Sequence, residues 1–344
     1  MKKIIAVLLS LMLFLSCTAV TAGLADDQQL NVVVTIFPIY DWVRETVGMD
    51  ASHVNLTLLL DSGVDLHSYQ PTARDILTIS TADLFIYVGG ESDEWVEDVL
   101  ASAMNLGLKA ISLVEAMGDD IRMEEIVEGM EHEHNHDHDH EEDEDHDHEE
   151  DHDHEEEHDH EEEEEDEADE HVWLSLRCAQ KLTAVITDTL AEIDPGYAEQ
   201  YRTNAAAYLD KLAGLDAQYA ETVSASAFKT ILFGDRFPFR YLADDYGLTY
   251  YAAFSGCSAE SEASFATIIF LAQKVDELGL PAVLTIEHPT TRIAETIVQN
   301  TASKNQKILT LDSMQGTTSA DIAAGITYLS VMESNLKVLK EALN

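Results

Sequence analysis

Apolar runs and amphipathic stretches alternate along the chain from residue 31 onward, in two similar halves. Runs rich in β-branched and aromatic residues are typical of buried strands, and here they predict strands at 31–36, 54–60, 84–89, 109–114, 230–234, 248–254, 281–287 and 307–312. In the second half, helices are predicted at 236–246, 262–278, 289–301 and 320–342. Strands that alternate with helices predict an α/β fold, here two Rossmann-like lobes with parallel sheets.

A long amphipathic segment lies between the two halves. After a Pro-Gly breaker at 194–196, tyrosine and leucine residues recur at spacings of three, four and seven as far as Tyr219. This is the period of a helix with one apolar face, and about 30 helical residues would span about 45 Å. We therefore predict one long rigid helix at 196–227, which joins an amino-terminal lobe at 26–195 to a carboxy-terminal lobe at 228–344.

The amino end, 1–25, has the layout of an export signal. Two lysines precede an apolar run that is too short to span a membrane. Ser16 directly before Cys17 favours a lipoprotein signal in which Cys17 becomes the acylated first residue, and cleavage after Ala22 or Ala25 is the alternative. Both place the mature chain outside the cytoplasmic membrane, as an anchored lipoprotein or a periplasmic protein.

Charge is concentrated in one tract. The net charge of the 344 residues is −48, and residues 131–170 hold 27 acids and no Lys or Arg, which leaves −21 for the rest. An acidic chain without a basic patch repels phosphate backbones and is not expected to bind nucleic acid. The tract also contains eleven histidines but no apolar face, so we predict a disordered loop at 119–170.

The function of this tract is open between two hypotheses. Carboxylates concentrate divalent cations and imidazole pairs hold them loosely, so the tract could gather or buffer zinc for a site elsewhere. The alternative is a solvated tether with incidental metal affinity.

The state of the two remaining cysteines is also open. Cys178 and Cys257 could form a disulfide in an oxidising compartment or remain two separate thiols.

Metal-binding side chains follow several of the predicted strands. In open parallel sheets, ligands bind beyond the carboxyl ends of the strands. The residues found there, or at the end of the His-rich tract, are His67, His171, Asp235, Glu287, His288 and Asp312. Two imidazoles with one or two carboxylates suit Zn²⁺, whereas more oxygen ligands would suit Mn²⁺.

Several motifs resemble the zinc/manganese family of ABC-transporter solute-binding proteins. They are VTIFPIYDWVRETVG, DSGVDLHSYQPTARDILTISTADLFIYVGG, DEHVWLSLRCAQKL and FRYLADDYGL, and the similarity covers essentially the whole mature chain. The resemblance implies a monomeric protein of two lobes joined by a rigid helix, with one metal ion held between them. It also implies delivery to a membrane permease that is driven by a cytoplasmic ATPase.

The resemblance also implies a ligand set, with one departure. By position, His67 and His171 match the ligands of the first lobe, and Asp312 matches the acidic ligand of the second. The third ligand of the family is usually His or Glu, but Gly234 occupies its position here. Asp235, Glu287, His288 or water could replace it, and Asp235 could instead cap the helix that follows.

Other classes of function are less favoured. A metallohydrolase would need a general base and an oxyanion stabiliser beside the metal, and the sequence contains neither an HExxH motif nor a Gly-rich nucleophile turn. We therefore expect a protein that is not an enzyme. A manganese-binding member of the same family, or an extracellular metal buffer or adhesin without a transporter, remains an alternative.

Overall fold

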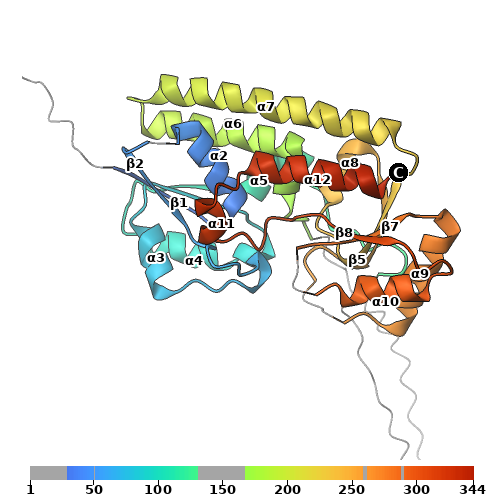
Figure 1. The fold of residues 1–344 in the computed structure, drawn as a ribbon. Coiled ribbons are helices and arrows are strands. Elements are labelled where there is room, and N and C mark those ends of the chain that lie inside the picture. Colours follow the sequence, from blue (N-terminus) through green and yellow to red (C-terminus); the bar gives the residue numbers. More distant parts are fainter. Residues whose placement is uncertain (1–28, 50, 131–166, 259–261, 288–289) are drawn as a thin grey trace, which may run out of the picture.

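Two α/β lobes lie side by side beneath a pair of long helices (Figure 1). The computed structural model describes residues 29–49, 51–130, 167–258, 262–287 and 290–344. Each lobe contains a parallel four-stranded sheet, with strand orders β2-β1-β3-β4 and β6-β5-β7-β8. The strands are β1 (Leu30–Val34), β2 (Val54–Leu58), β3 (Leu84–Tyr87), β4 (Lys109–Ser112), β5 (Thr230–Arg236), β6 (Thr249–Phe254), β7 (Ala282–Thr285) and β8 (Lys307–Thr310).

All eight predicted strands are confirmed, and their apolar residues explain why they lie inside the sheets. Val32 and Val34 of β1 and Leu84 of β3 are fully buried, because these central strands are covered on both faces. The chain order reverses between β1 and β3 in the first lobe and between β5 and β7 in the second. Such reversals open a crevice at the carboxyl ends of the strands, where ligands bind in open parallel sheets.

Helices cover both faces of the two sheets. They are α2 (Phe37–Val47), α3 (Ala73–Ser80), α4 (Trp95–Ala101), α5 (Leu113–Met117), α8 (Arg240–Tyr246), α9 (Phe265–Leu278), α10 (Arg292–Asn300), α11 (Ser319–Ala323) and α12 (Tyr328–Ala342). The helix predicted at 320–342 is in fact two helices. Gly325, with φ of 95°, ends α11, and Thr327 caps the start of α12.

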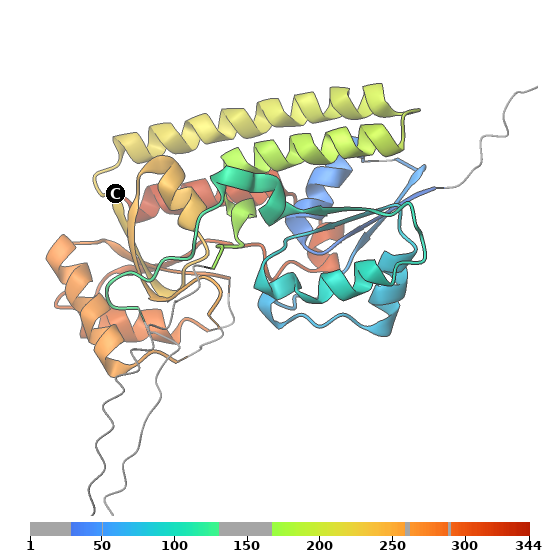
Figure 2. The same cartoon turned by 180° about the vertical axis from the view of Figure 1, so that it is seen from behind.

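The two lobes are joined by an antiparallel helix pair that runs along one side of both (Figures 1 and 2). The pair consists of α6 (Leu176–Ile193) and α7 (Ala198–Ala225). Helix α7 corresponds to the predicted connecting helix, and at 28 residues it is about 42 Å long. Its apolar stripe, including Tyr201 and Tyr219, is buried against the lobes as the spacing predicted.

Buried polar contacts also tie the lobes together. The Trp173 indole N–H donates to the carbonyl oxygen of Ser313 at 2.9 Å, and the Tyr328 hydroxyl donates to the carbonyl oxygen of Trp173 at 2.7 Å. The Tyr328 backbone N–H donates to Asp41 on α2. Trp173 and Tyr328 belong to one hydrophobic cluster that extends through both lobes. A shared core of this kind resists a wide opening of the cleft.

The prediction of disorder over 119–170 is wrong at both ends of that range. The backbone N–H of Arg122 donates to the Tyr241 hydroxyl, Met123 bridges Ala168, and Met130 is buried. Apolar residues of this segment pack on the common core, whereas the histidine-rich run without apolar residues begins only at 131. The segment crosses from the first lobe to the second (Figure 2). The tract itself, 131–166, lies outside the described residues, as does the predicted signal with Cys17.

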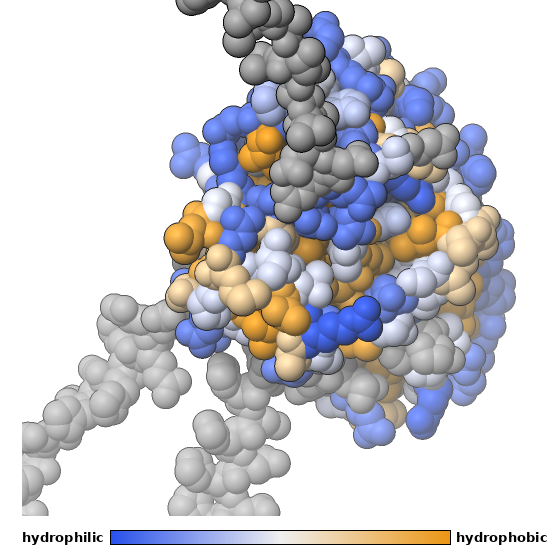
Figure 3. All heavy atoms as spheres, turned by 90° about the vertical axis from the view of Figure 1, so that its left-hand side faces the viewer, coloured by the Kyte–Doolittle hydropathy of each residue, from blue (hydrophilic) through white to orange (hydrophobic). Residues whose placement is uncertain are grey.

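The end of the first lobe carries a mixed surface. Hydrophilic residues dominate the view in Figure 3, with smaller hydrophobic areas between them. Scattered exposed apolar residues are ordinary on a folded protein. Among the described residues, no helix combines the length and the hydropathy that crossing a membrane would require.

Candidate metal centre

His67 reaches the cleft from a loop that follows β2. It lies on the 3-10 turn η1 (Leu66–Ser68), which Asp65 caps by accepting a hydrogen bond from the His67 backbone N–H at 3.0 Å. The ring Nδ1 lies 2.8 Å from Oγ of Ser92 and 3.7 Å from a carboxylate oxygen of Glu170. Because these groups engage Nδ1, Nε2 is the nitrogen that faces the cleft.

His171 lies where the chain returns from the acidic tract. It precedes the 3-10 turn η4 (Val172–Leu174) and has no exposed surface. Oδ1 of Asp169 accepts from the His171 backbone N–H at 2.8 Å and lies 3.0 Å from the ring Nδ1. A carboxylate only accepts hydrogen bonds, so Nδ1 carries the ring proton and Nε2 of the neutral ring carries the lone pair. A buried carboxylate behind a histidine is the usual support of a metal-binding imidazole.

The two imidazoles face each other through the same atom. Nε2 of His67 lies 3.2 Å from Nε2 of His171. Two nitrogens on a tetrahedral Zn²⁺, with bonds of about 2.0–2.1 Å, would be about 3.3 Å apart. Burial lowers the pKa of His67 to about 3, and the neighbouring His171 ring and Arg236 act in the same direction, against Asp65. His67 is therefore neutral near pH 7, which is the form that binds metal.

The resemblance places the family's third ligand at Gly234, which has no side chain to bind a metal ion. A Cβ atom on Gly234 of β5 would lie 2.6 Å from Cα and 2.8 Å from the backbone nitrogen of Ala294, on α10. The backbone of α10 thus occupies the space that a ligand side chain would need. A distance below 3.0 Å to backbone atoms leaves no room for any residue with a side chain.

Cys257 is the donor that the second lobe does bring to the pair. Its Sγ and one nitrogen each of His67 and His171 all lie within 4.8 Å of one another. Gly256, next to it, allows this approach, because a Cβ there would lie 3.0 Å from Cε1 of His171. The sequence analysis considered Cys257 only as a disulfide partner of Cys178, and the structure leaves both thiols free.

A signal in the sequence could have identified Cys257. It follows β6 after only two residues, Ser255 and Gly256, so the rule that placed the other candidates beyond strand ends applies to it equally. Burial raises the pKa of the Cys257 thiol far above its usual range, and the carboxylates of Glu124, Glu170 and Asp169 raise it further. Without a cation, the thiol is protonated.

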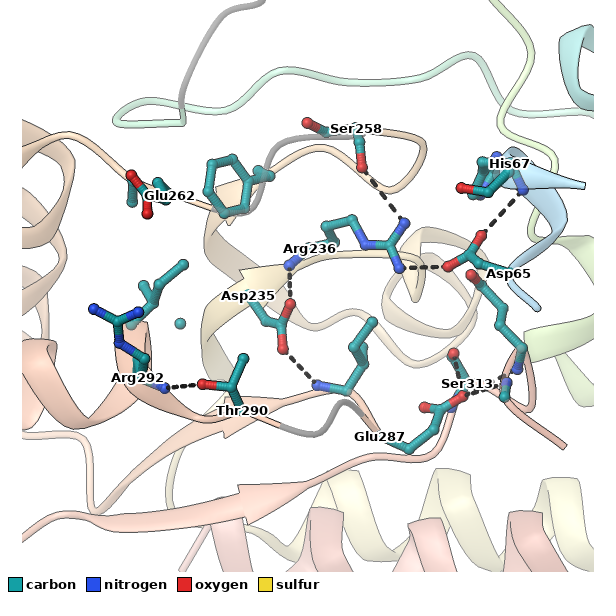
Figure 4. Close-up of a pocket in the computed structure, with 18 of the residues that line it drawn as sticks. Asp65, His67, Asp235, Arg236, Ser258, Glu262, Glu287, Thr290, Arg292 and Ser313 are labelled. Carbon is teal, nitrogen blue, oxygen red and sulfur yellow. Dashed lines mark hydrogen bonds and ion pairs between the residues drawn. The ribbon is translucent and has the colours of Figure 1, made fainter. Parts of the chain in front are cut away.

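Asp235 has a structural role in the cavity between the lobes, a space of about 830 Å³ that His67 and Asp65 also line. Its carboxylate accepts from the backbone N–H of Arg236 at 2.9 Å and of Ile286 at 3.2 Å, which joins the ends of β5 and β7 (Figure 4). It does not cap the following helix, because β5 continues to Arg236 and α8 begins only at Arg240.

Arg236 crosses the same cavity from the second lobe to the first. Its guanidinium donates to Asp65 at 2.6 Å and to the carbonyl oxygen of Ser258 at 3.4 Å (Figure 4). Burial raises the pKa of Asp65, but the charge and hydrogen bond of Arg236, together with those of His67, more than offset it, so the net pKa is lowered. This ion pair thus closes one side of the cleft next to His67.

The carboxylates beyond β7 and β8 serve backbone groups. Glu287 accepts from the backbone N–H groups of Ser313 and Gln315, and Oδ1 of Asp312 accepts from that of Met314 at 2.8 Å. Burial raises the pKa of both carboxyls. Neither joins the His67, His171 and Cys257 group found among the described residues. The ligand roles of Asp312 and Asp235 stay predictions, and His288 lies outside the described residues.

Gln315 completes the surroundings of the imidazole pair. With its amide nitrogen 2.9 Å from Oδ2 of Asp65, the amide oxygen of Gln315 lies 3.1 Å from Nε2 of His171. Its side chain is buried. An amide oxygen at this place is an additional oxygen donor within reach of an ion between the two rings.

Two α/β lobes joined by a long helix, with the Nε2 atoms of two imidazoles 3.2 Å apart in the cleft between them, form an arrangement whose geometry fits a divalent metal ion. The chain belongs to the family described as zinc-uptake complex component A, periplasmic, whose model matches residues 32–342.

Individual relatives agree with this assignment. The chain is 34% identical over 99% of its length to the zinc-binding lipoprotein AdcA of Streptococcus pneumoniae serotype 4, but spans only 61% of that protein. It is 32% identical to the high-affinity zinc uptake system protein ZnuA of Bacillus subtilis, with 94% and 91% of the two chains covered. The crystal structure of the Zn(II)-bound ZnuA-like domain of S. pneumoniae AdcA matches with a TM-score of 0.67 and 30% identity, over 92% of this chain and 99% of that one.

Proposed function

We propose that this protein captures Zn²⁺ outside the cytoplasmic membrane and delivers it to an ABC permease driven by a cytoplasmic ATPase. The observation that carries the proposal is the pair of Nε2 atoms on His67 and His171, 3.2 Å apart, each on a ring whose other nitrogen is engaged. Such a pair needs no rearrangement to chelate a tetrahedral ion.

The relatives support zinc as the cargo. Both curated relatives described above are named for zinc, and a structural neighbour is titled as Zn(II)-bound. The chain covers about three fifths of the AdcA protein, so the function proposed here is that of the two-lobe unit alone. A ligand set closed by protein side chains suits a carrier, because a catalytic zinc keeps a position open for substrate.

Release to the permease requires the lobe interface to change. The shared core and the contacts of Trp173 and Tyr328 favour a modest shift of lobes and loops over a wide hinge motion. Solution scattering with and without Zn²⁺ tests this, and a large decrease in radius of gyration on binding would contradict it.

Competition titration of the full chain against a chelator tests the site itself. The acidic tract binds metal as well, so the expected result is one tight site above several weak ones. His67→Ala and His171→Ala should each weaken the tight site by about 10²–10³-fold and leave the weak ones unchanged. Tight binding of one zinc at wild-type strength by both variants would remove the proposed site.

The acidic tract and the amino end complete the proposal. The ordered flanks of the tract reach the site, since Glu124 accepts a hydrogen bond from the Cys257 backbone N–H and the other flank leads directly into His171. We therefore assign the tract to gathering zinc, and deletion of 131–166, which leaves Asp169 and Glu170 beside the imidazoles, should slow uptake when zinc is scarce. The protein acts as a monomer, held at the membrane by a lipid on Cys17, and radiolabelled palmitate incorporation that persists in Cys17→Ala would contradict the anchor.

A further inference from the structure

By the resemblance, Gly234 occupies the position of the family's third ligand, and the structure brings a different group to the two imidazoles. Gly234 cannot hold a ligand, because α10 fills the space beside it. The sulfur of Cys257 meanwhile lies within 4.8 Å of the donor atoms of His67 and His171. We infer that Cys257 binds the transported ion as a thiolate and supplies the donor that Gly234 does not, an inference that rests on the proposed zinc capture.

Backbone geometry holds Cys257 against the first lobe. The loop after β6 contacts the ring of His171 through Gly256, where a Cβ would lie 3.0 Å from Cε1 and 3.1 Å from Nδ1. The Cys257 backbone N–H donates to Oε1 of Glu124 at 3.1 Å, on the segment that crosses between the lobes. The loop therefore reaches the imidazoles without a long side chain, and a short thiol suffices to complete the contact.

The sulfur itself has the support that metal-bound thiolates use. A backbone hydrogen bond from Glu170 favours the charged form of the Cys257 sulfur. Glu170 precedes His171 directly, so the same few residues position an imidazole ligand and orient the thiolate. Binding replaces the S–H bond with a sulfur–metal bond, and the thiol proton leaves to solvent.

The distances fit zinc after a small contraction. With bonds of about 2.3 Å to sulfur and about 2.0–2.1 Å to nitrogen, a tetrahedral zinc places sulfur about 3.6 Å from each nitrogen. Because the donor atoms lie within 4.8 Å of one another, the closure needed is at most about 1 Å, which a side-chain rotation or a small lobe shift provides.

A sulfur donor also decides between the two candidate metals. Thiolate is a soft ligand that selects zinc, whereas manganese prefers carboxylate, carbonyl and water oxygens. A site with two imidazoles and one thiolate therefore favours Zn²⁺ over Mn²⁺ more strongly than a site of imidazoles and carboxylates.

The test is metal spectroscopy on the full chain with one equivalent of zinc or cobalt. Residues 131–170 contain no cysteine, so the tract cannot contribute a sulfur signal. X-ray absorption at the zinc edge should show one sulfur at about 2.3 Å beside nitrogen and oxygen at about 2.0–2.1 Å. The cobalt form should show sulfur-to-metal charge-transfer absorption. Cys257→Ser should lose both signals and weaken zinc binding about 100-fold or more.

Cys178→Ser is the matched control, because Cys178 is a buried free thiol on α6 outside the donor group. It should retain both signals and wild-type affinity. A wild-type spectrum without sulfur, together with zinc binding that is still lost in His171→Ala, would overturn the thiolate and leave the proposed function standing. Zinc binding that is unaffected in His171→Ala would instead remove the proposed function. If Cys257→Ser does not fold, the wild-type spectrum alone still shows whether a sulfur atom binds the ion.

Discussion

The two lobes bring different chemistry to the cleft. The first lobe supplies two imidazoles, and each has a partner on Nδ1: Ser92 behind His67, and Asp169 behind His171. The second lobe supplies the thiol of Cys257 on a loop and, across the cavity, the guanidinium of Arg236.

The first lobe therefore holds its ligands in place before the ion binds, whereas the second lobe must adjust its position. The nitrogens of the first lobe already lie at a separation that fits tetrahedral zinc, whereas the sulfur, within 4.8 Å of them, approaches by up to about 1 Å when the ion binds. Most of the binding free energy should therefore depend on the first lobe, while the choice of metal depends on the second.

The largest expected effect comes from removing a prearranged imidazole. If a total of about 10–16 kcal/mol for a structural zinc is shared by four ligands, His171→Ala should weaken zinc binding by about 10²–10³-fold. Competition with a chelator measures this. His53→Ala is the control, because His53 bonds to Tyr201 and stacks on Tyr197 away from the site, and it should leave zinc affinity unchanged. Equal losses in both variants would point to general destabilisation instead.

The next test attempts to give the second lobe the missing imidazole. Gly234→His should fail, because its Cβ would lie 2.6 Å from Cα of Ala294, and overpacking of this kind costs about 3 kcal/mol. Thermal unfolding of the metal-free protein should show a lower midpoint with no gain in zinc affinity. A stable variant that binds zinc more tightly would show that α10 can move and would weaken the contrast between the lobes.

The contribution of the groups behind the imidazoles is smaller. Asp169→Asn retains the shape of the side chain but removes the charge that fixes the His171 tautomer, and partners of this kind change metal affinity by about 10–100-fold. Asp194→Asn is the matched control, since Asp194 accepts from the Tyr201 hydroxyl outside the site. A titration in which both substitutions leave zinc affinity unchanged would mean that the ring of His171 is held by packing alone.

Much of the architecture was predictable from local patterns. The eight strands and the face of α7 follow from β-branched runs and from tyrosine spacing, because both reflect burial of whole segments. The break at Gly325 was missed, since a single positive φ decides it. The ordered flanks of the acidic tract were also missed, because a few apolar residues anchor them against a distant lobe.

The candidate site was likewise only partly predictable from the sequence. His67 and His171 were predicted from motifs and are brought together, whereas Cys257 was missed although it follows a strand in the same way. Its significance depends on two facts about packing that no spacing reveals. One is that α10 excludes a side chain at Gly234, and the other is that Gly256 lets the loop approach His171.

The smallest predicted effect concerns the stability of the metal-free protein at mildly acidic pH. Burial, the neighbouring His171 ring and Arg236 lower the pKa of His67 to about 3 from 6.5. Between these values the unfolded chain binds a proton that the folded chain does not, so folding stability is lost as the pH falls below 6.5. The first unit of pH below that value should remove about 1 kcal/mol.

Chemical denaturation of the metal-free protein at pH 6.5 and at about pH 5.5 measures this loss. Other groups titrate in the same range, so the informative quantity is the difference between wild type and His67→Gln, which carries no ionisable ring. The variant should lose about 1 kcal/mol less than wild type over this interval. Parallel curves for the two proteins would mean that His67 accepts a proton readily in the folded state, and that the first lobe does not hold its imidazoles ready for metal as argued here.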